Sequence, residues 1–260
     1  METLERNENM VIIKSEREIQ MMHEAGKLLA LTHKEIAKII RPGITTLEID
    51  AFVERFLHEH GATPEQKGYH GFPYAICASV NDEICHGFPS DQPLKDGDVV
   101  TIDMVVNLNG YLADSAWTYI VGNPTPRAQK LVEVAKESLY RGIEQAVVGN
   151  RLGDIGHAIQ SFVEAHGFSV VRDFTGHGIG TSMHEDPQVL HYGQPGKGLR
   201  LKEGMVITIE PMVNEGKWQC KIDRNGWTAR TIDGKLSAQF EHTVAITKDG
   251  PLILTDQDAV

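Results

Sequence analysis

The sequence predicts an α+β fold of two related halves, in which helices cover the outer face of a curved antiparallel sheet. One observation is an internal repeat: the segment Ile49 to Gly61 matches Ile155 to Gly167, 106 positions later. A second stretch, LKDGDVVTIDMVV from Leu94, matches LKEGMVITIEPMV from Leu201, 107 positions later. The other observation is that each half opens with helical patterns and continues with short apolar segments. This period is far too long for a solenoid, so we expect a pseudo-twofold axis between the halves.

Two helices are predicted at the start of the first half. Each opens with a capping-box pattern, Ser15 with Glu18 and Thr45 with Glu48. Apolar residues then recur every three or four positions, which indicates one buried face per helix. The stop signals are Pro42-Gly43 for the first helix and Gly61 for the second.

The second half repeats this arrangement. One helix is expected from Pro126 to about Val148, and another carries Ile155 and Phe162 before Gly167. Each half then continues with a strand, a turn that bears a histidine, and a strand hairpin.

The clearest hairpin runs from Val99 to Val121 around the turn NLNG. If the turn is symmetric about Leu108 and Asn109, Asp103 faces Asp114 across the strands. Two facing carboxylates repel each other unless a cation lies between them. A turn centred on Asn109-Gly110 instead would move Asp114 out of opposition.

Four acids lie in strands that are otherwise rich in Val, Ile and Thr. Asp103 maps onto Glu210 through the repeat, and the downstream strands of the halves carry Asp114 and Glu241. A lone acid on a strand is usually solvated, but four buried ones need counter-charge, because each unpaired carboxylate costs several kcal/mol. With His177, whose flanking glycines allow close approach, they form a suitable ligand set for two ions of Mn, Fe, Co or Zn.

Two further histidines, His86 in HGFP and His184 in HEDP, occupy matched places in the halves. This suggests that they flank one central cleft. Neither has the spacing of a two-histidine metal motif, and Gln188 stands where a zincin needs its second histidine. We therefore expect hydrogen-bonding and acid/base roles for both. The loop residues His70 and His191 are assigned no role.

Composition limits the possible partners. The chain has 25 basic and 36 acidic residues, a net charge of −11, which argues against nucleic acid or an anionic membrane. Three cysteines without CxxC spacing favour a reducing compartment, and no signal peptide or membrane-length apolar run is seen, so a cytoplasmic protein is expected. We predict an N-terminal tail at 1–14 and one domain at 15–260, with the repeats at about 15–122 and 126–250.

Several motifs together resemble the type I methionine aminopeptidases, which have the pita-bread fold. These are VNDEICHG, TIDMVVNLNGYLADSAWT, TGHGIG, HEDPQVLHYG, GMVITIEPM and SAQFEHT, and the resemblance extends over Lys14 to Leu254. It implies a two-metal enzyme that removes N-terminal methionine from nascent polypeptides when the second residue is small and uncharged. It further implies action at the ribosome and a monomeric state.

The resemblance also implies residue roles. Asp103, Asp114, His177, Glu210 and Glu241 would hold two divalent ions, and Glu210 would be the general base. His184 would stabilise the oxyanion, and His86 would contact the scissile nitrogen. The methionine side chain would lie among Tyr69, Phe72, Cys77, Met183 and Trp227; Phe72 and Met183 stand where relatives often have Tyr and Phe. Asn81 and Ser237 resemble a monovalent-cation site.

Three alternatives are less consistent with the sequence. Aminopeptidase P and prolidase usually carry a large N-terminal domain, whereas about 14 residues precede the first helix here. Type II methionine aminopeptidases insert a subdomain between the equivalents of His177 and Glu210, which are 33 positions apart here. A catalytically dead binding module of the same fold would be expected to lose ligands and to become basic.

Overall fold

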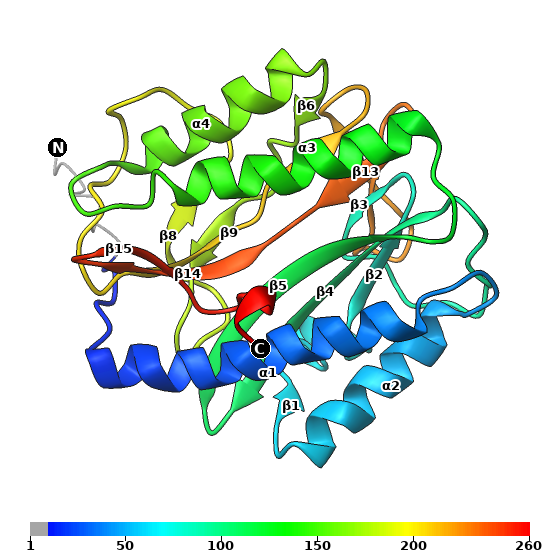
Figure 1. The fold of residues 1–260 in the computed structure, drawn as a ribbon, viewed down its shortest axis with the longest axis horizontal. Coiled ribbons are helices and arrows are strands. Elements are labelled where there is room, and N and C mark those ends of the chain that lie inside the picture. Colours follow the sequence, from blue (N-terminus) through cyan, green and yellow to red (C-terminus); the bar gives the residue numbers. More distant parts are fainter. Residues whose placement is uncertain (1–9) are drawn as a thin grey trace, which may run out of the picture.

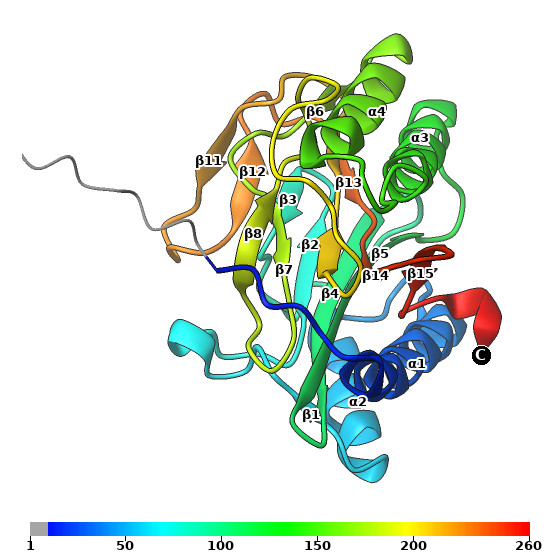
Figure 2. The same ribbon diagram turned by 90° about the vertical axis from the view of Figure 1, so that its left-hand side faces the viewer.

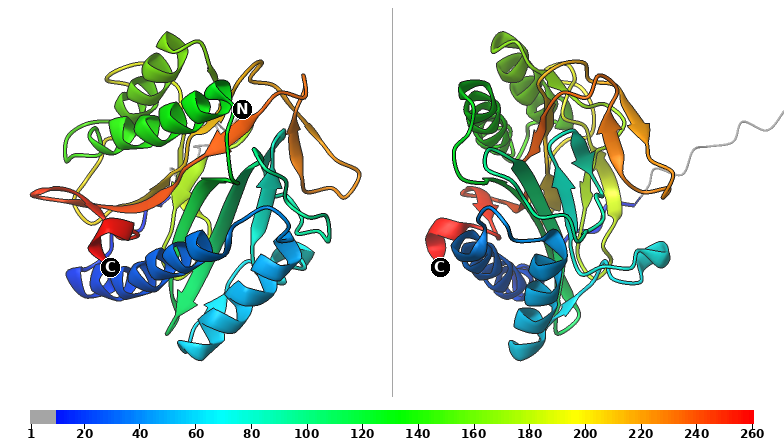
Figure 3. Two further views of the ribbon diagram at one scale, coloured as in Figure 1. Left: turned by 45° about the vertical axis from the view of Figure 1, so that its right-hand side comes forward. Right: turned by 90° about the vertical axis from the view of Figure 1, so that its right-hand side faces the viewer.

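Two helix pairs pack against antiparallel strands, one pair in each half of the chain (Figure 1). The structure is a computed structural model that describes residues 10–260. The helices are α1 (Glu16–Ile39), α2 (Thr46–Glu59), α3 (Pro126–Ile143) and α4 (Leu152–Ala165), with 3₁₀ turns η1 (Tyr69–Gly71) and η2 (Gln257–Ala259). In the left view of Figure 3, the pair α3–α4 lies above the central strands and the pair α1–α2 below them.

The strands pair only in antiparallel fashion within the described residues. They are β1 (Thr63–Pro64), β2 (Cys77–Val80), β3 (Glu83–Cys85), β4 (Val99–Leu108), β5 (Tyr111–Ile120), β6 (Ser169–Val170), β7 (Gly176–Gly178), β8 (Glu185–Val189), β9 (Val206–Ile209), β10 (Met212–Asn214), β11 (Cys220–Ile222), β12 (Ala229–Thr231), β13 (Ser237–Gln239), β14 (His242–Thr247) and β15 (Gly250–Ile253). The longest ladder joins β4 to β5, and β4 also pairs with β1 and β2. The largest sheet has the order β15-β14-β9-β7-β8. In Figure 2, α1 and α3 lie on the side of the strands away from β8 and β11.

The helix starts follow their local signals. Both predicted capping boxes are present, at α1 and α2, and Gly61 follows the end of α2 with φ +73°. The prediction for α3 was too long, because the helix ends at Ile143. There the amides of Gln145 and Ala146 bond to carbonyls three residues back, a tighter turn than an α-helix.

The predicted hairpin register was wrong by two residues. Asp103 lies opposite Ala116, and Asp114 lies opposite Val105. Asn109 and Gly110 both have positive φ, so the turn is centred on them, as expected for a two-residue Asn-Gly hairpin. A shift of two residues keeps each side chain on its face, so the two acids remain diagonal neighbours.

Each half has its own apolar core. In the first half, Leu29, Ile49 and Ile102 are fully buried between α1, α2 and the sheet. In the second half, Leu131 and Ile207 are fully buried among α3, α4 and β9. Trp117 on β5 packs against both cores, which joins the halves at their centre. No helix in residues 10–260 has the length and hydropathy that crossing a membrane requires.

Candidate active site

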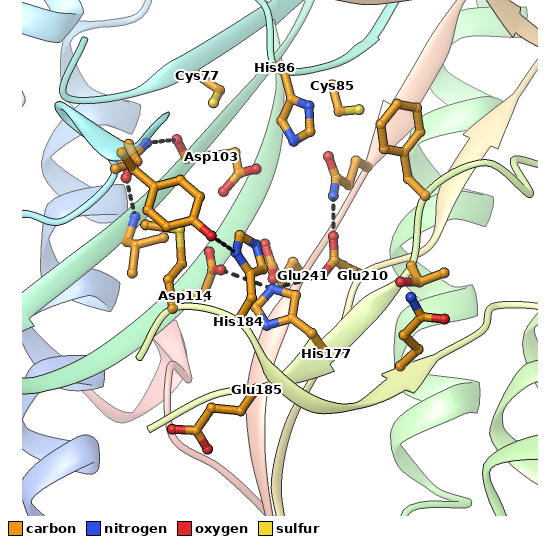
Figure 4. Close-up of a pocket in the computed structure, with 18 of the residues that line it drawn as sticks. Cys77, Cys85, His86, Asp103, Asp114, His177, His184, Glu185, Glu210 and Glu241 are labelled. Carbon is orange, nitrogen blue, oxygen red and sulfur yellow. Dashed lines mark hydrogen bonds and ion pairs between the residues drawn. The ribbon is translucent and has the colours of Figure 1, made fainter. Parts of the chain in front are cut away.

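A cavity of about 720 Å³ opens between the halves. All twelve side chains that the sequence analysis assigned to divalent-metal binding, catalysis or substrate binding line it, whereas Asn81 and Ser237 do not. The twelve are Tyr69, Phe72, Cys77, His86, Asp103, Asp114, His177, Met183, His184, Glu210, Trp227 and Glu241. Figure 4 shows the four acids and His177 gathered at its centre.

Both halves supply the acids. Asp103 and Asp114 project from β4 and β5, whereas Glu210 lies between β9 and β10, and Glu241 between β13 and β14. The amide of Glu241 donates to the Ala116 carbonyl on β5 at 2.9 Å. This bond brings the second half's acid against the first half's hairpin.

Asp103, Glu210 and Glu241 have pKa values above their ordinary ones. Burial raises the pKa of Asp103 and of Glu241 well above the ordinary values, and neighbouring carboxylates raise them further. Burial likewise raises the pKa of Glu210 to about 7, although His177 acts in the opposite direction. The carboxylates therefore repel one another in a site that supplies too little positive charge.

His177 is oriented toward this charge. Its Nδ1 lies 2.9 Å from the Gly178 carbonyl and donates to it, so Nε2 faces the acids, 3.6 Å from oxygens of both Asp114 and Glu210. Burial acts to lower its pKa, but Asp114 and Glu210 outweigh burial and raise the pKa to about 9. A ring that donates to a carbonyl and directs its other nitrogen at carboxylates has the typical arrangement of a metal-ligating histidine.

These residues fit divalent cations. Ligand atoms of Asp114, His177 and Glu241 lie within 4.8 Å of one another. One oxygen each of Asp114 and Glu241 is buried without a hydrogen-bond partner in residues 10–260. Buried carboxylate oxygens are rarely left unpaired, and oxygen and imidazole donors suit transition metals.

Two histidines approach the acids from different sides (Figure 4). The Nδ1 of His184 lies 2.9 Å from the Tyr69 hydroxyl, a hydrogen bond in which either group can donate. Partial burial and nearby His177 lower its pKa to about 4, so the ring is neutral at pH 7. Burial also lowers the pKa of His86, which has φ +55° and packs edge-on against Phe174.

The expected methionine pocket forms the apolar wall of the cavity. Phe72 contacts Trp227 edge-to-face with ring centroids 5.2 Å apart. Cys77 and Met183 are 7% exposed, and burial raises the pKa of the Cys77 thiol well above its usual value. Aromatic rings and sulfur atoms form an apolar, polarisable lining suited to a thioether.

Three residues that hold Glu210 were not foreseen. The Glu210 amide donates to Nε2 of the fully buried His191 at 3.1 Å. Thr208 and Gln239 donate to its two carboxylate oxygens at 2.7 and 3.3 Å. The sequence carried no signal for His191, because its role depends on a backbone group 19 residues away.

Asn81 and Ser237 are also neighbours, since the Ser237 amide donates to the Asn81 carbonyl at 2.9 Å. The Asn81 side chain bonds to Val99 and Asp98. The monovalent cation expected between them stays a prediction.

The segment before α1 is described only from residue 10 onward. Residues 1–9 lie outside the described part, but Lys14 is buried in an ion pair with Glu185. The division into tail and domain stays a prediction.

Comparison with known proteins gives one consistent result. The family model of metallopeptidase family M24 matches residues 20–248. Methionine aminopeptidase 1 of Bacillus subtilis is 54% identical over 246 residues, covering 95% of this chain and 99% of the relative. The Escherichia coli methionine aminopeptidase is 44% identical, with 94% of each chain covered.

Solved structures agree with these relatives. The Rickettsia prowazekii methionine aminopeptidase superposes with a TM-score of 0.94 at 45% identity, covering 95% of this chain and 100% of the other. A Pyrococcus horikoshii prolidase superposes at 0.77 with 26% identity, covering 94% of this chain and 63% of the prolidase. These neighbours confirm the pita-bread fold. Through its M24 match and these full-length relatives, the chain belongs to metallopeptidase family M24, among the methionine aminopeptidases.

Proposed function

We propose that the enzyme uses two divalent ions to remove N-terminal methionine from polypeptides whose second residue is small and uncharged. The observation that carries this proposal is the convergence of four acids and His177 in one cavity without matching positive charge. Mn, Fe, Co and Zn suit these donors, and Asn81 and Ser237 would hold an additional monovalent cation. Bound divalent ions would supply Lewis acidity and lower the pKa of water at the centre.

Glu210 is proposed as the general base that accepts a proton from the attacking water. Thr208 and Gln239 fix its two oxygens, and His191 fixes its backbone. A base held in one orientation needs no reorganisation during proton transfer.

The two cleft histidines would act on the peptide bond from different sides. His184 would donate a hydrogen bond from Nε2 to the developing oxyanion, in the tautomer whose Nδ1 accepts from the Tyr69 hydroxyl. His86 would contact the scissile nitrogen, from a backbone conformation that a non-glycine residue rarely adopts.

Specificity would arise in two places. Tyr69, Phe72, Cys77, Met183 and Trp227 would bind the methionine side chain, each methylene of which contributes about 0.8 kcal/mol when buried. The second residue would lie in the crowded region near His86. A bulky residue there would displace the scissile carbonyl, and a displacement of about 1 Å can cost on the order of 10²-fold in rate.

The proposed substrates are the N-termini of nascent polypeptides at the ribosome, and the enzyme would act as a cytoplasmic monomer. The excess of acidic over basic residues supports protein rather than nucleic acid as the direct partner.

Turnover of four tripeptides tests the proposal. Met-Ala-Ser should be cleaved at least about 10²-fold faster than Met-Leu-Ser, and faster than Ala-Ala-Ser or Leu-Ala-Ser. Metal content of the active protein, measured by elemental analysis, should approach two ions per chain. Comparable rates for Met-Leu-Ser and Met-Ala-Ser would refute the second-residue claim, and faster release of Leu than of Met would refute the pocket.

A further inference from the structure

The segment that leads into α1 lies on the rim of the active-site cavity. Met10 and Ile12 line the same cavity as the catalytic side chains. They are also 86% and 51% exposed, which places them where the cavity meets solvent. Figure 2 shows this dark blue segment passing β8 and β7 on its way to α1.

The segment alternates in the way of an extended chain. Met10 and Ile12 face the cavity, whereas Val11 packs against the core of the second half. Ile13 lines a neighbouring groove with Pro187 and Leu199. Successive side chains of an extended chain point to opposite sides. Val11 accordingly packs on the body beside Ile12, which is open to the cavity, and Met10 lines both the cavity and the neighbouring groove.

Lys14 anchors the segment. Its ammonium pairs with Glu185, and the two side chains are only 5% and 7% exposed. Its amide donates to the Gly204 carbonyl at 2.8 Å, and its Nζ lies 3.3 Å from the Ile12 carbonyl. Breaking a buried pair leaves an uncompensated charge, so this attachment is firm.

The anchor attaches to the part of the chain that carries catalytic histidines. Glu185 directly follows His184 in the chain. The aliphatic part of the Lys14 side chain lies against Gly180, two residues after β7, the strand that carries His177. An added Cβ at Gly180 would lie 2.6 Å from Cε of Lys14, so a side chain there would displace the lysine. The rim segment therefore has a defined position relative to the reacting centre.

We propose that Met10 and Ile12 form an apolar subsite for the third and fourth residues of the polypeptide substrate. This inference rests on the proposed function, because the first two residues would occupy the depth of the cavity and the rest of the chain must leave across its rim. When apolar side chains of the substrate cover these two exposed apolar side chains, apolar surface is removed from water, which favours substrate binding. Their continuity with the active-site cavity identifies the substrate itself as the occupant.

The test compares peptide length and third-residue chemistry in Ile12→Ser. The substrates are Met-Ala-Ser, Met-Ala-Ser-Ser-Ser and Met-Ala-Leu-Leu-Ser. The ratio of kcat/KM for the Leu-Leu pentapeptide to that for the tripeptide should fall about fivefold in the variant, mainly through KM, as expected for partial burial of one aliphatic side chain. The Lys14 contact to residue 12 uses its backbone carbonyl, so the substitution leaves the anchor in place.

Leu47→Ser is the matched control, since Leu47 is an apolar residue on α2 with 37% exposure and does not line the cavity. The ratio of kcat/KM for the Leu-Leu pentapeptide to that for the tripeptide should be the same in Leu47→Ser as in the unaltered enzyme. An unchanged ratio in Ile12→Ser would overturn the subsite, and so would an equal loss on the Ser-Ser-Ser pentapeptide. Failure of the unaltered enzyme to cleave any of these Met-Ala peptides would instead overturn the proposed function, and the subsite with it.

Discussion

The two halves of the molecule present their matched acids in different ways. Asp103 lies inside the ten-residue strand β4, which pairs with β2 on one side and β5 on the other. Glu210, its counterpart in the repeat, lies in a gap between two short strands, β9 and β10. The register of Ile209 with His242 and of Met212 with Gln239 places Glu210 opposite Glu241 in this gap.

The gap between β9 and β10 changes the groups that surround Glu210. Ladder bonds to neighbouring strands fix the backbone at Asp103, whereas His191 holds the Glu210 amide and two further side chains hold its carboxylate. A repeat of this kind places acids symmetrically around the centre. The gap between β9 and β10, which β4 lacks, lets other side chains orient Glu210, the acid to which we assign proton transfer.

The largest effect is expected when a single acid is removed, in one variant from the first half and in another from the second half. Glu241→Gln and Asp103→Asn should each lose on the order of 10³-fold or more in kcat, because the metal ions contribute several kcal/mol to the transition state. Elemental analysis should show reduced metal content in both variants. In metal-free protein, both variants should also be more stable than the parent to urea, because the substitution relieves repulsion between buried carboxylates. Full activity in either variant would refute the dinuclear centre.

The next test concerns His184 and the tyrosine that contacts it. His184→Ala should keep its metal but lose about 10²–10³ in kcat, the usual cost of one oxyanion donor. Tyr69→Phe, which removes the hydroxyl hydrogen-bonded to His184 Nδ1, should show a smaller loss in the same direction. Loss of metal from folded His184→Ala protein would show that this residue is a ligand instead.

A smaller effect is expected from the support of Glu210. His191→Ala leaves the buried Glu210 amide without its acceptor, which costs about 1–3 kcal/mol. We expect the loss to appear in kcat more than in KM, since the general base is misoriented while the substrate pocket is intact. His191→Gln places an amide oxygen near the position of Nε2 and should recover most of the activity. Equal losses in both variants would indicate a packing role only.

Local signals explain why much of the fold followed from the sequence. The capping boxes at Ser15 and Thr45 each act within four residues, so they start helices wherever tertiary packing permits. The β4–β5 register was predicted wrongly although its signal was also local. The alternative turn centred on Asn109-Gly110, which would move Asp114 out of opposition to Asp103, is the one the structure shows, with Asp114 opposite Val105.

The match of Asp103 with Glu210 followed from the repeat, but the contacts that hold Glu210 in place did not. A repeat matches Asp103 to Glu210 because it reports equivalent backbone positions. It cannot report the bond from Glu210 to His191 or the pair of Lys14 with Glu185, because it does not say which residues contact each other within one half or across the halves. Such contacts depend on tertiary geometry, and one sequence contains no periodic pattern for them.

The smallest predicted effect compares two matched helix starts. Thr45 accepts a hydrogen bond from the Glu48 amide at 3.1 Å, which satisfies one of the free donors at the start of α2. Arg151, 106 positions later, is the residue immediately before α4. Its guanidinium has no acceptor atom, so it cannot accept a hydrogen bond from a helix amide. At this helix start the backbone amide of Arg151 donates to the Asp154 carboxylate at 2.7 Å. Because this bond uses the backbone of residue 151, replacing its side chain leaves the bond in place. Thr45→Ala should therefore lower the free energy of unfolding by about 1 kcal/mol. Arg151→Ala should stay within about 0.5 kcal/mol, since it removes only an exposed bond to the Gly198 carbonyl. Urea unfolding of the two variants measures the difference, and equal losses would show that the side chain at the helix start is not what distinguishes the halves.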